Sequence, residues 1–125
     1  MNATELPRNP EAEAFFRSLA VHSDLFAEWR GALARLGEFE VRHAPQASGA
    51  AYAITKDFVF CGAAGMKHTY WRLRPNDIEI ALATGAMAAP FSSDWVLIEL
   101  FRSDWPKPDL PFWALRAYDF ARTGN

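Results

Sequence analysis

The chain has 125 residues, of which 50% are apolar and 22% charged, and its formal net charge is −2. This composition is typical of one globular domain, because it supplies enough apolar surface for a single core. The slight negative charge excludes a general attraction to nucleic acid or anionic lipid, and no apolar run is long enough for a membrane span. The lone cysteine excludes an internal disulfide, so we expect a cytoplasmic protein.

Two helices are predicted in the N-terminal part, after residues 1–8, which we expect to form a flexible arm. Asn9-Pro10 supplies a cap and a first-turn proline for a helix that should end near Val21. Ser23 can cap a second helix, whose apolar residues recur every three or four positions until Gly37 ends it.

From residue 38 the apolar period changes to two, which is typical of strands. A half-exposed strand is predicted over residues 39–44. Residues 50–61 form either one long bent strand or two strands of a hairpin, over 50–55 and 58–61, and both alternatives stay open. The glycine-rich residues 62–65 predict a turn, and residues 67–74 a further strand.

The remaining elements are a helix over 76–85, a strand over 94–101, a turn over 105–108 and a helix that Asp109 caps. The strand over 94–101 is the most apolar and should be central. We predict a single domain over residues 1–125 with an α+β fold of order α-α-β-β-β-α-β-α. A helical pair over 9–37 precedes a sheet with two helices over 38–125. The helices should pack on one face of an antiparallel sheet of about four to five strands.

One face of the predicted sheet is the best candidate for a binding surface. Alternation along two strands places six side chains on it, four of them cationic or aromatic and close in sequence. Such a face could hold a planar or anionic small molecule by stacking and charge-assisted hydrogen bonds. Alternatively, Glu99 pairs with Arg72 or Arg74 across the sheet, and the aromatic side chains of this face complete a second small core or a dimer interface. The six candidate ligand-binding residues are His68, Tyr70, Arg72, Arg74, Trp95 and Glu99.

Other chemistry has little support in the sequence. Cys61 could pair with His68 as a nucleophile, but it follows an apolar run and we expect it to be buried, and hence expect no catalysis. The histidines lack metal-ligand spacing, and the phosphate-loop and dinucleotide motifs are missing, so we expect no metal and no cofactor. Four basic residues alternate with aromatic ones over 56–74, a mixture used by single-strand nucleic-acid platforms. Four cations are few, and we do not expect nucleic-acid binding.

Residues 67–122 resemble a group of small uncharacterised bacterial domains known as the "luciferase domain" family. The members share G-x-A-x-P, G-W-V and L-x-L-x-x-x-Y-x-x-A patterns, and they usually carry a His-x-His-Gly segment where this chain has only His68. The corresponding residues are Gly85, Ala88, Pro90, Asp94, Trp95, Val96, Trp113, Leu115, Tyr118 and Ala121, with one more residue between Gly85 and Ala88, and one fewer between Leu115 and Tyr118, than in these patterns. The order of elements is also similar to that of MmcQ/YjbR-like proteins, which would imply a DNA-binding or regulatory module.

We therefore predict a small domain that binds a small molecule or a protein partner through the sheet face described above. Five tryptophans in 125 residues are many, and Trp95, Trp105 and Trp113 stand near turns or helix starts. This favours a homodimer as a further possibility.

Overall fold

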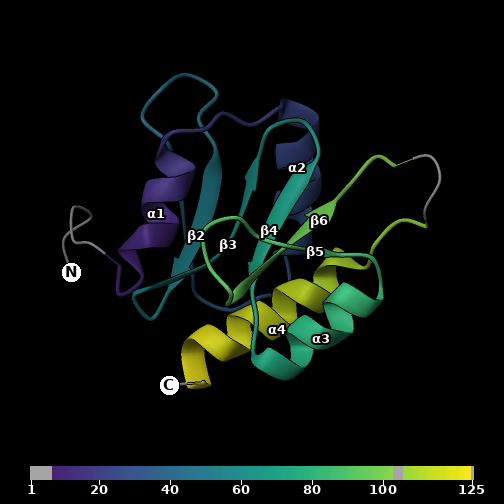
Figure 1. Ribbon diagram of the computed structural model, residues 1–125. Helices are drawn as coiled ribbons and strands as arrows, with labels where there is room; N and C mark the ends of the chain where they lie inside the picture. The colour runs from purple at the N-terminus through teal and green to yellow at the C-terminus, as the bar shows by residue number, and fades with distance from the viewer. Residues whose placement is uncertain (1–6, 103–105, 125) are drawn as a thin grey trace.

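The computed structural model describes residues 7–102 and 106–124, and the predictions for residues 1–6 and for Trp105 lie outside them. Four helices and six strands are found there (Figure 1). All strand pairs are antiparallel, and the sheet has the order β1-β2-β3-β4-β6-β5. The elements are α1 (Pro10–Arg17), α2 (Ser23–Ala32), β1 (Glu40–His43), β2 (Ala51–Thr55), β3 (Phe58–Ala64), β4 (His68–Arg72), α3 (Pro75–Ala83), β5 (Met87–Ala88), β6 (Trp95–Glu99) and α4 (Leu110–Thr123).

The predicted α+β class with an antiparallel sheet is confirmed, and the sheet has six strands instead of four to five. Residues 51–64 form the two-stranded alternative, a hairpin that turns at Lys56-Asp57, both with positive φ. The turn predicted at 62–65 is wrong in its position, because β3 continues to Ala64 and pairs there with His68. The short strand β5 was not predicted.

The strand predicted to be central, β6, lies between β4 and β5. Val96, Ile98 and Leu100 point to the same side as Trp71 on β4, as the period of two predicts, and belong to the larger hydrophobic core. Buried residues of α2, α3 and α4 complete this core. We call this side of the sheet the α2–α4 face.

Helix α1 does not share that face, which corrects the expectation that the helices lie together. Its Phe16 is fully buried in a second hydrophobic cluster with Tyr52, Tyr70 and Trp95, which point to the other side of the sheet, here called the α1 face. The helix also ends at Arg17 and not near Val21. Val21 instead forms an isolated bridge with Gly65, and its N–H donates to a loop carbonyl.

Polar contacts fix α1 to the sheet in addition to this packing. The Asn9 side chain donates to the Val59 carbonyl at 2.8 Å and accepts from the Val59 N–H at 2.9 Å, so it extends the pairing of β3. The buried Glu13 carboxylate accepts from the Tyr52 hydroxyl at 2.8 Å and from Arg42 at 3.1 Å. Each of these buried polar side chains has a hydrogen-bond partner, which compensates for the water that it loses on burial.

Helices α3 and α4 lie side by side across one end of the molecule (Figure 1), where Arg116 of α4 stands 3.9 Å from Asp77 of α3. Asp109 caps α4 as predicted, by accepting from the Phe112 N–H. No helix in the described ranges is both long and apolar enough to cross a membrane.

Candidate functional site

The aromatic residues of the predicted binding face are not open to solvent. Tyr70 is 5% exposed and Trp95 is 2% exposed, because α1 lies over both. Phe15 and Phe16 of α1 contact the Tyr70 ring edge-on, and Phe91 packs on Trp95. The rings therefore form a second small core, which was the alternative interpretation of this face.

Arg72 lies at the edge of this cluster, clamped between two rings. Its guanidinium carbon is 4.4 Å from the centroid of Phe58 and 4.2 Å from that of Phe120. Burial lowers the pKa of Arg72, and the charges of Asp94 and Glu11 raise it by less. Its Nη1 atom is buried without a hydrogen-bond partner in the described chain. Cation–π contacts thus hold Arg72 in place, and its charge is not presented to a ligand.

Two further arginines extend this stack. Arg8 lies 4.9 Å from the Phe58 centroid, and Arg74 lies 5.2 Å from that of Phe120 while donating to Asp119 and Thr123 on α4. Cations and rings therefore alternate here, as the mixture over 56–74 suggested. The guanidinium groups occupy the ring faces on which bases would stack, so this arrangement gives no support to nucleic-acid binding.

Glu99 has partners other than those expected. Neither Arg72 nor Arg74 pairs with it; its carboxylate lies 3.7 Å from Lys67 Nζ, 3.7 Å from His68 Nε2 and 3.8 Å from Arg102 Nε. Of the six candidate residues, only His68 and Glu99 form such a pair at a partly exposed position. The structure therefore separates the six predicted residues into three groups. Tyr70 and Trp95 lie in the buried ring cluster. The other four are the arginines of the cation–ring stack at one end of β4 and the His68–Glu99 pair at the other end.

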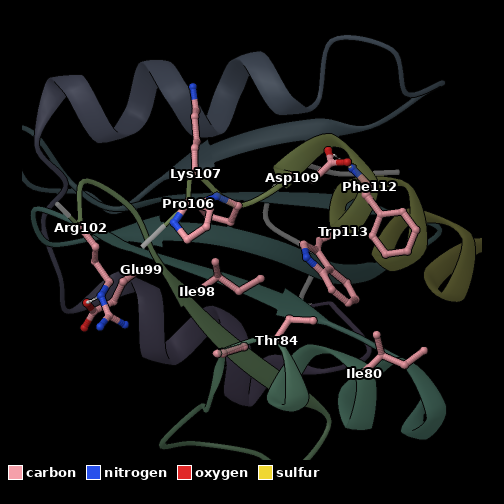
Figure 2. A pocket seen from close by; sticks show the side chains of 13 residues that line it. Ile80, Thr84, Ile98, Glu99, Arg102, Pro106, Lys107, Asp109, Phe112 and Trp113 are labelled. Atoms are coloured by element: carbon pink, nitrogen blue, oxygen red, sulfur yellow. Dashed lines mark hydrogen bonds and ion pairs between the residues drawn. The ribbon is translucent and has the colours of Figure 1, made fainter. Parts of the chain in front are cut away.

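Glu99 also lines a cavity that the sequence did not reveal. This cavity has a volume of about 450 Å³ and lies between α3, β6 and the start of α4. Figure 2 shows Glu99 and Arg102 together at one end of it and Phe112, Trp113 and Ile80 at the other. The volume falls within the range of about 300–1,000 Å³ that small-molecule sites occupy.

The apolar end of the cavity includes large apolar side chains that are exposed to solvent. Ile80 on α3 is 51% exposed and Phe112 on α4 is 38% exposed. Between them, Ile98 of β6 and Trp113 form apolar lining that continues into the core. A molecule that entered here would remove apolar surface from water on several sides, which is the main source of affinity in such sites.

A smaller cavity of about 230 Å³ adjoins the first, and Glu99, Arg102 and residues 106–108 line both. Lys107 points away from the larger cavity (Figure 2) and pairs with Glu28 of α2 at 2.7 Å. The segment 106–108 is thereby fixed to the neighbouring helix, and the charge of Lys107 is already balanced outside the cavity.

The other candidate groups lie apart from this cavity. Cys61 is fully buried on the α2–α4 face opposite Trp71, whereas His68 pairs across the sheet with Ala64, so the two do not meet. Burial raises the pKa of the Cys61 thiol well above 9.0, and the Trp29 indole lowers it by less. A buried thiol of this kind is a poor nucleophile. No group of three or more possible metal ligands occurs in the described residues.

One sequence signal could have indicated the cavity. Ile78, Ile80 and Leu82 recur every second residue in a helix, so they point in different directions around its axis and cannot all be buried. Leu82 is 43% exposed, and Ile80, which is 51% exposed, lines the cavity. Apolar residues with strand spacing inside a helix therefore mark surface that needs another cover.

Comparison of the chain with protein-family models, with curated proteins and with solved structures finds no match. The resemblance to the "luciferase domain" family and to MmcQ/YjbR-like proteins therefore stays a prediction, and the proposals below depend on the geometry alone.

Proposed function

We propose that this domain binds a small molecule with an apolar body in the cavity between α3, β6 and α4. The observation that carries the proposal is the cavity itself, about 450 Å³ in volume, with apolar lining at one end and the Glu99–Arg102 pair at the other. Small-molecule sites commonly combine apolar walls with a few polar groups that orient the ligand. The small-molecule binding predicted from the sequence is kept, but its place changes, since only Glu99 of the six candidates lines this cavity.

Nuclear magnetic resonance can test the proposal with probes of defined chemistry. A ¹⁵N-labelled sample is titrated with 1-octanol and, separately, with 1-methoxyheptane, an isomer that has the same atoms. If the cavity binds an apolar body, amide shifts will concentrate around Gly85, Ala86 and Phe112, and Tyr52 on the far side of the sheet will not respond. Shifts from neither probe, or shifts spread without relation to the cavity, would contradict the proposal.

Two residues of α4 provide a matched pair of variants. Phe112 and Leu115 are both exposed and lie three residues apart, but only Phe112 lines the cavity. Phe112→Ala should weaken probe binding several-fold because it removes one wall, whereas Leu115→Ala should leave binding unchanged. Neither variant should unfold the protein, since exposed side chains contribute little to its stability. Equal effects of the two substitutions would mean that the probes bind elsewhere.

The same surface could instead be covered by a second copy of the chain, as the homodimer prediction has it. Sedimentation of the probe-free protein separates the two cases, because a monomer has a mass of 14.0 kDa. We expect a monomer that retains probe binding. A dimer that Phe112→Arg converts to monomers would assign the exposed apolar residues to an interface between copies.

A further inference from the structure

Strand β1 forms one edge of the sheet, and β2 is its only neighbour among the described strands. The Ala44 N–H donates to the Ala50 carbonyl at 2.8 Å in the continuation of the same register, so the backbone of Ala44 points toward β2. Backbone groups of an antiparallel strand alternate between its two sides. Glu40 and Arg42 therefore bond to β2. The N–H and C=O groups of Val41, and of the residues two positions before and after it, point away from the sheet and have no partner strand in the described chain.

The side chains of β1 decide which strand can bind to this edge through its backbone. Arg42 points to the α1 face, where it donates to Glu40 at 2.5 Å and to Glu13 at 3.1 Å. A guanidinium has five N–H groups, so Arg42 can donate to one more carboxylate. Val41 and His43 point to the other face, toward the core and a ring of α2. An antiparallel strand that fits here carries a base opposite Glu40, an acid opposite Arg42 and an apolar residue between them.

The sequence of β1 itself has this pattern. Three antiparallel registers bring the outward groups of two β1 strands together. One of them sets Arg42 opposite Arg42, and another sets Glu40 opposite Glu40. Only the register centred on Val41 sets Glu40 of each copy opposite Arg42 of the other. Like charges directly opposite each other destabilise a sheet and opposite charges stabilise it, so the charges of β1 select this one register.

We infer that two copies of this chain pair through β1, antiparallel about a two-fold axis at Val41, so that their sheets become one. Val41 then exchanges two backbone hydrogen bonds with Val41 of the second copy, and Phe39 does the same with His43. Glu40 and Arg42 form an ion pair on each side of the axis.

This pairing is weak, because a strand of four residues makes a small contact. The monomer expected above therefore predominates at low micromolar concentration, and the dimer forms toward millimolar concentration. Strand β1 lies at the edge of the sheet opposite β5, whereas the cavity lies beside β6. The inference is thus independent of the proposed ligand site.

Nuclear magnetic resonance of the wild-type protein at low micromolar and at millimolar concentration tests the alternation along β1. The amides of Glu40 and Arg42 should resist hydrogen exchange at both concentrations, because they bond to β2. The amides of Val41 and His43 should exchange several-fold more slowly at the higher concentration only. In a mixture of isotope-labelled and unlabelled protein, a nuclear Overhauser contact should join the Hα atom of Glu40 in one copy to that of Arg42 in the other, where the two backbones come closest.

A charge reversal connects the association to the register. Glu40→Lys should weaken it at least about fivefold, because both ion pairs across the axis become repulsive. The Glu40 side chain is 52% exposed, so the variant should fold. Glu79→Lys makes the same change of charge at an exposed position on α3 and should leave the association unchanged. Val41 exchange at the same rate at both concentrations, or a Glu40→Lys protein that associates like the wild type, overturns the inference. An association that Phe112→Arg abolishes also overturns it, since the interface would then lie at the cavity.

Discussion

Adding one methyl group beneath α1 should destabilise the protein if this helix covers the sheet as described. A Cβ atom on Gly62 would lie 2.5 Å from Cε1 and 2.8 Å from Cε2 of Phe16, well inside normal contact. The Phe16 ring cannot retreat, because it stacks on Tyr52 at 5.7 Å and meets Tyr70 edge-on at 5.5 Å. Overpacking of this kind costs about 1–3 kcal/mol, which the loss of glycine's flexibility in the unfolded chain offsets by roughly 0.5–1 kcal/mol.

We therefore expect Gly62→Ala to lower the free energy of unfolding, measured with urea at neutral pH, by about 1–2 kcal/mol. This is equivalent to a fall of roughly 3–8 °C in Tm. Gly31→Ala is the matched control, since a Cβ on this exposed residue of α2 meets nothing within 4 Å. Gly31→Ala should raise the free energy of unfolding by up to about 0.5 kcal/mol, because alanine favours a helix more than glycine does.

A second substitution shows whether Phe16 causes the loss. Phe16→Leu leaves more room above Gly62, so the cost of Gly62→Ala should be smaller in that background than in the wild type. If Gly62→Ala unfolds at the same urea concentration as the wild type, then Phe16 does not rest on β3. The assignment of α1 to this face would then be wrong.

Three further predictions concern groups that the fold buries. Burial, with a hydrogen bond to Glu13, raises the pKa of Tyr52 from 10.0 to about 12, so the folded state holds this proton more tightly. Stability should thus fall between about pH 10 and 12, and urea midpoints of Tyr52→Phe should fall less over that interval. Cys61 should resist iodoacetamide at about pH 8 until urea unfolds the protein, and labelling of the folded chain, followed by mass spectrometry, would contradict its burial. Arg72→Ala should cost about 1–3 kcal/mol of unfolding free energy, because it removes the cation that lies between the Phe58 and Phe120 rings. Arg74→Ala removes a partly exposed ion pair and one longer ring contact and should cost under about 1 kcal/mol; equal costs would show that the position of Arg72 between the two rings adds nothing.

The sequence alone predicted the strands best where one period held for several residues. Alternation along 68–72 and 95–99 placed Trp71 and Val96 on one face and Tyr70 and Trp95 on the other, and both assignments are confirmed. This pattern is robust because a shift by one residue would move every side chain to the wrong face. It could not show what covers each face, because cover comes from elements distant in sequence.

Helix α1 shows why the cover was not predicted. Its apolar residues and those of α2 have the same helical spacing, so the pattern does not distinguish the face on which each helix lies. The distinguishing residue is Glu13, which looks like a favourable acid at a helix N-terminus but is buried against Tyr52 and Arg42. These partners are 39 and 29 residues away, and only the folded sheet brings them to the helix.

The position of the cavity follows from how the helices divide the sheet between them. Helix α1 closes the face on which we expected a ligand, so that face has no room left for one. On the opposite side α4 packs on β2, β3 and β4, whereas α3 packs on β5 and β6. Ile80 of α3 and Phe112 of α4 line the gap between these two packing regions, and they stay 51% and 38% exposed. Exposed apolar surface of this kind is where partners and ligands commonly bind, and this is the physical basis of the small-molecule site proposed above.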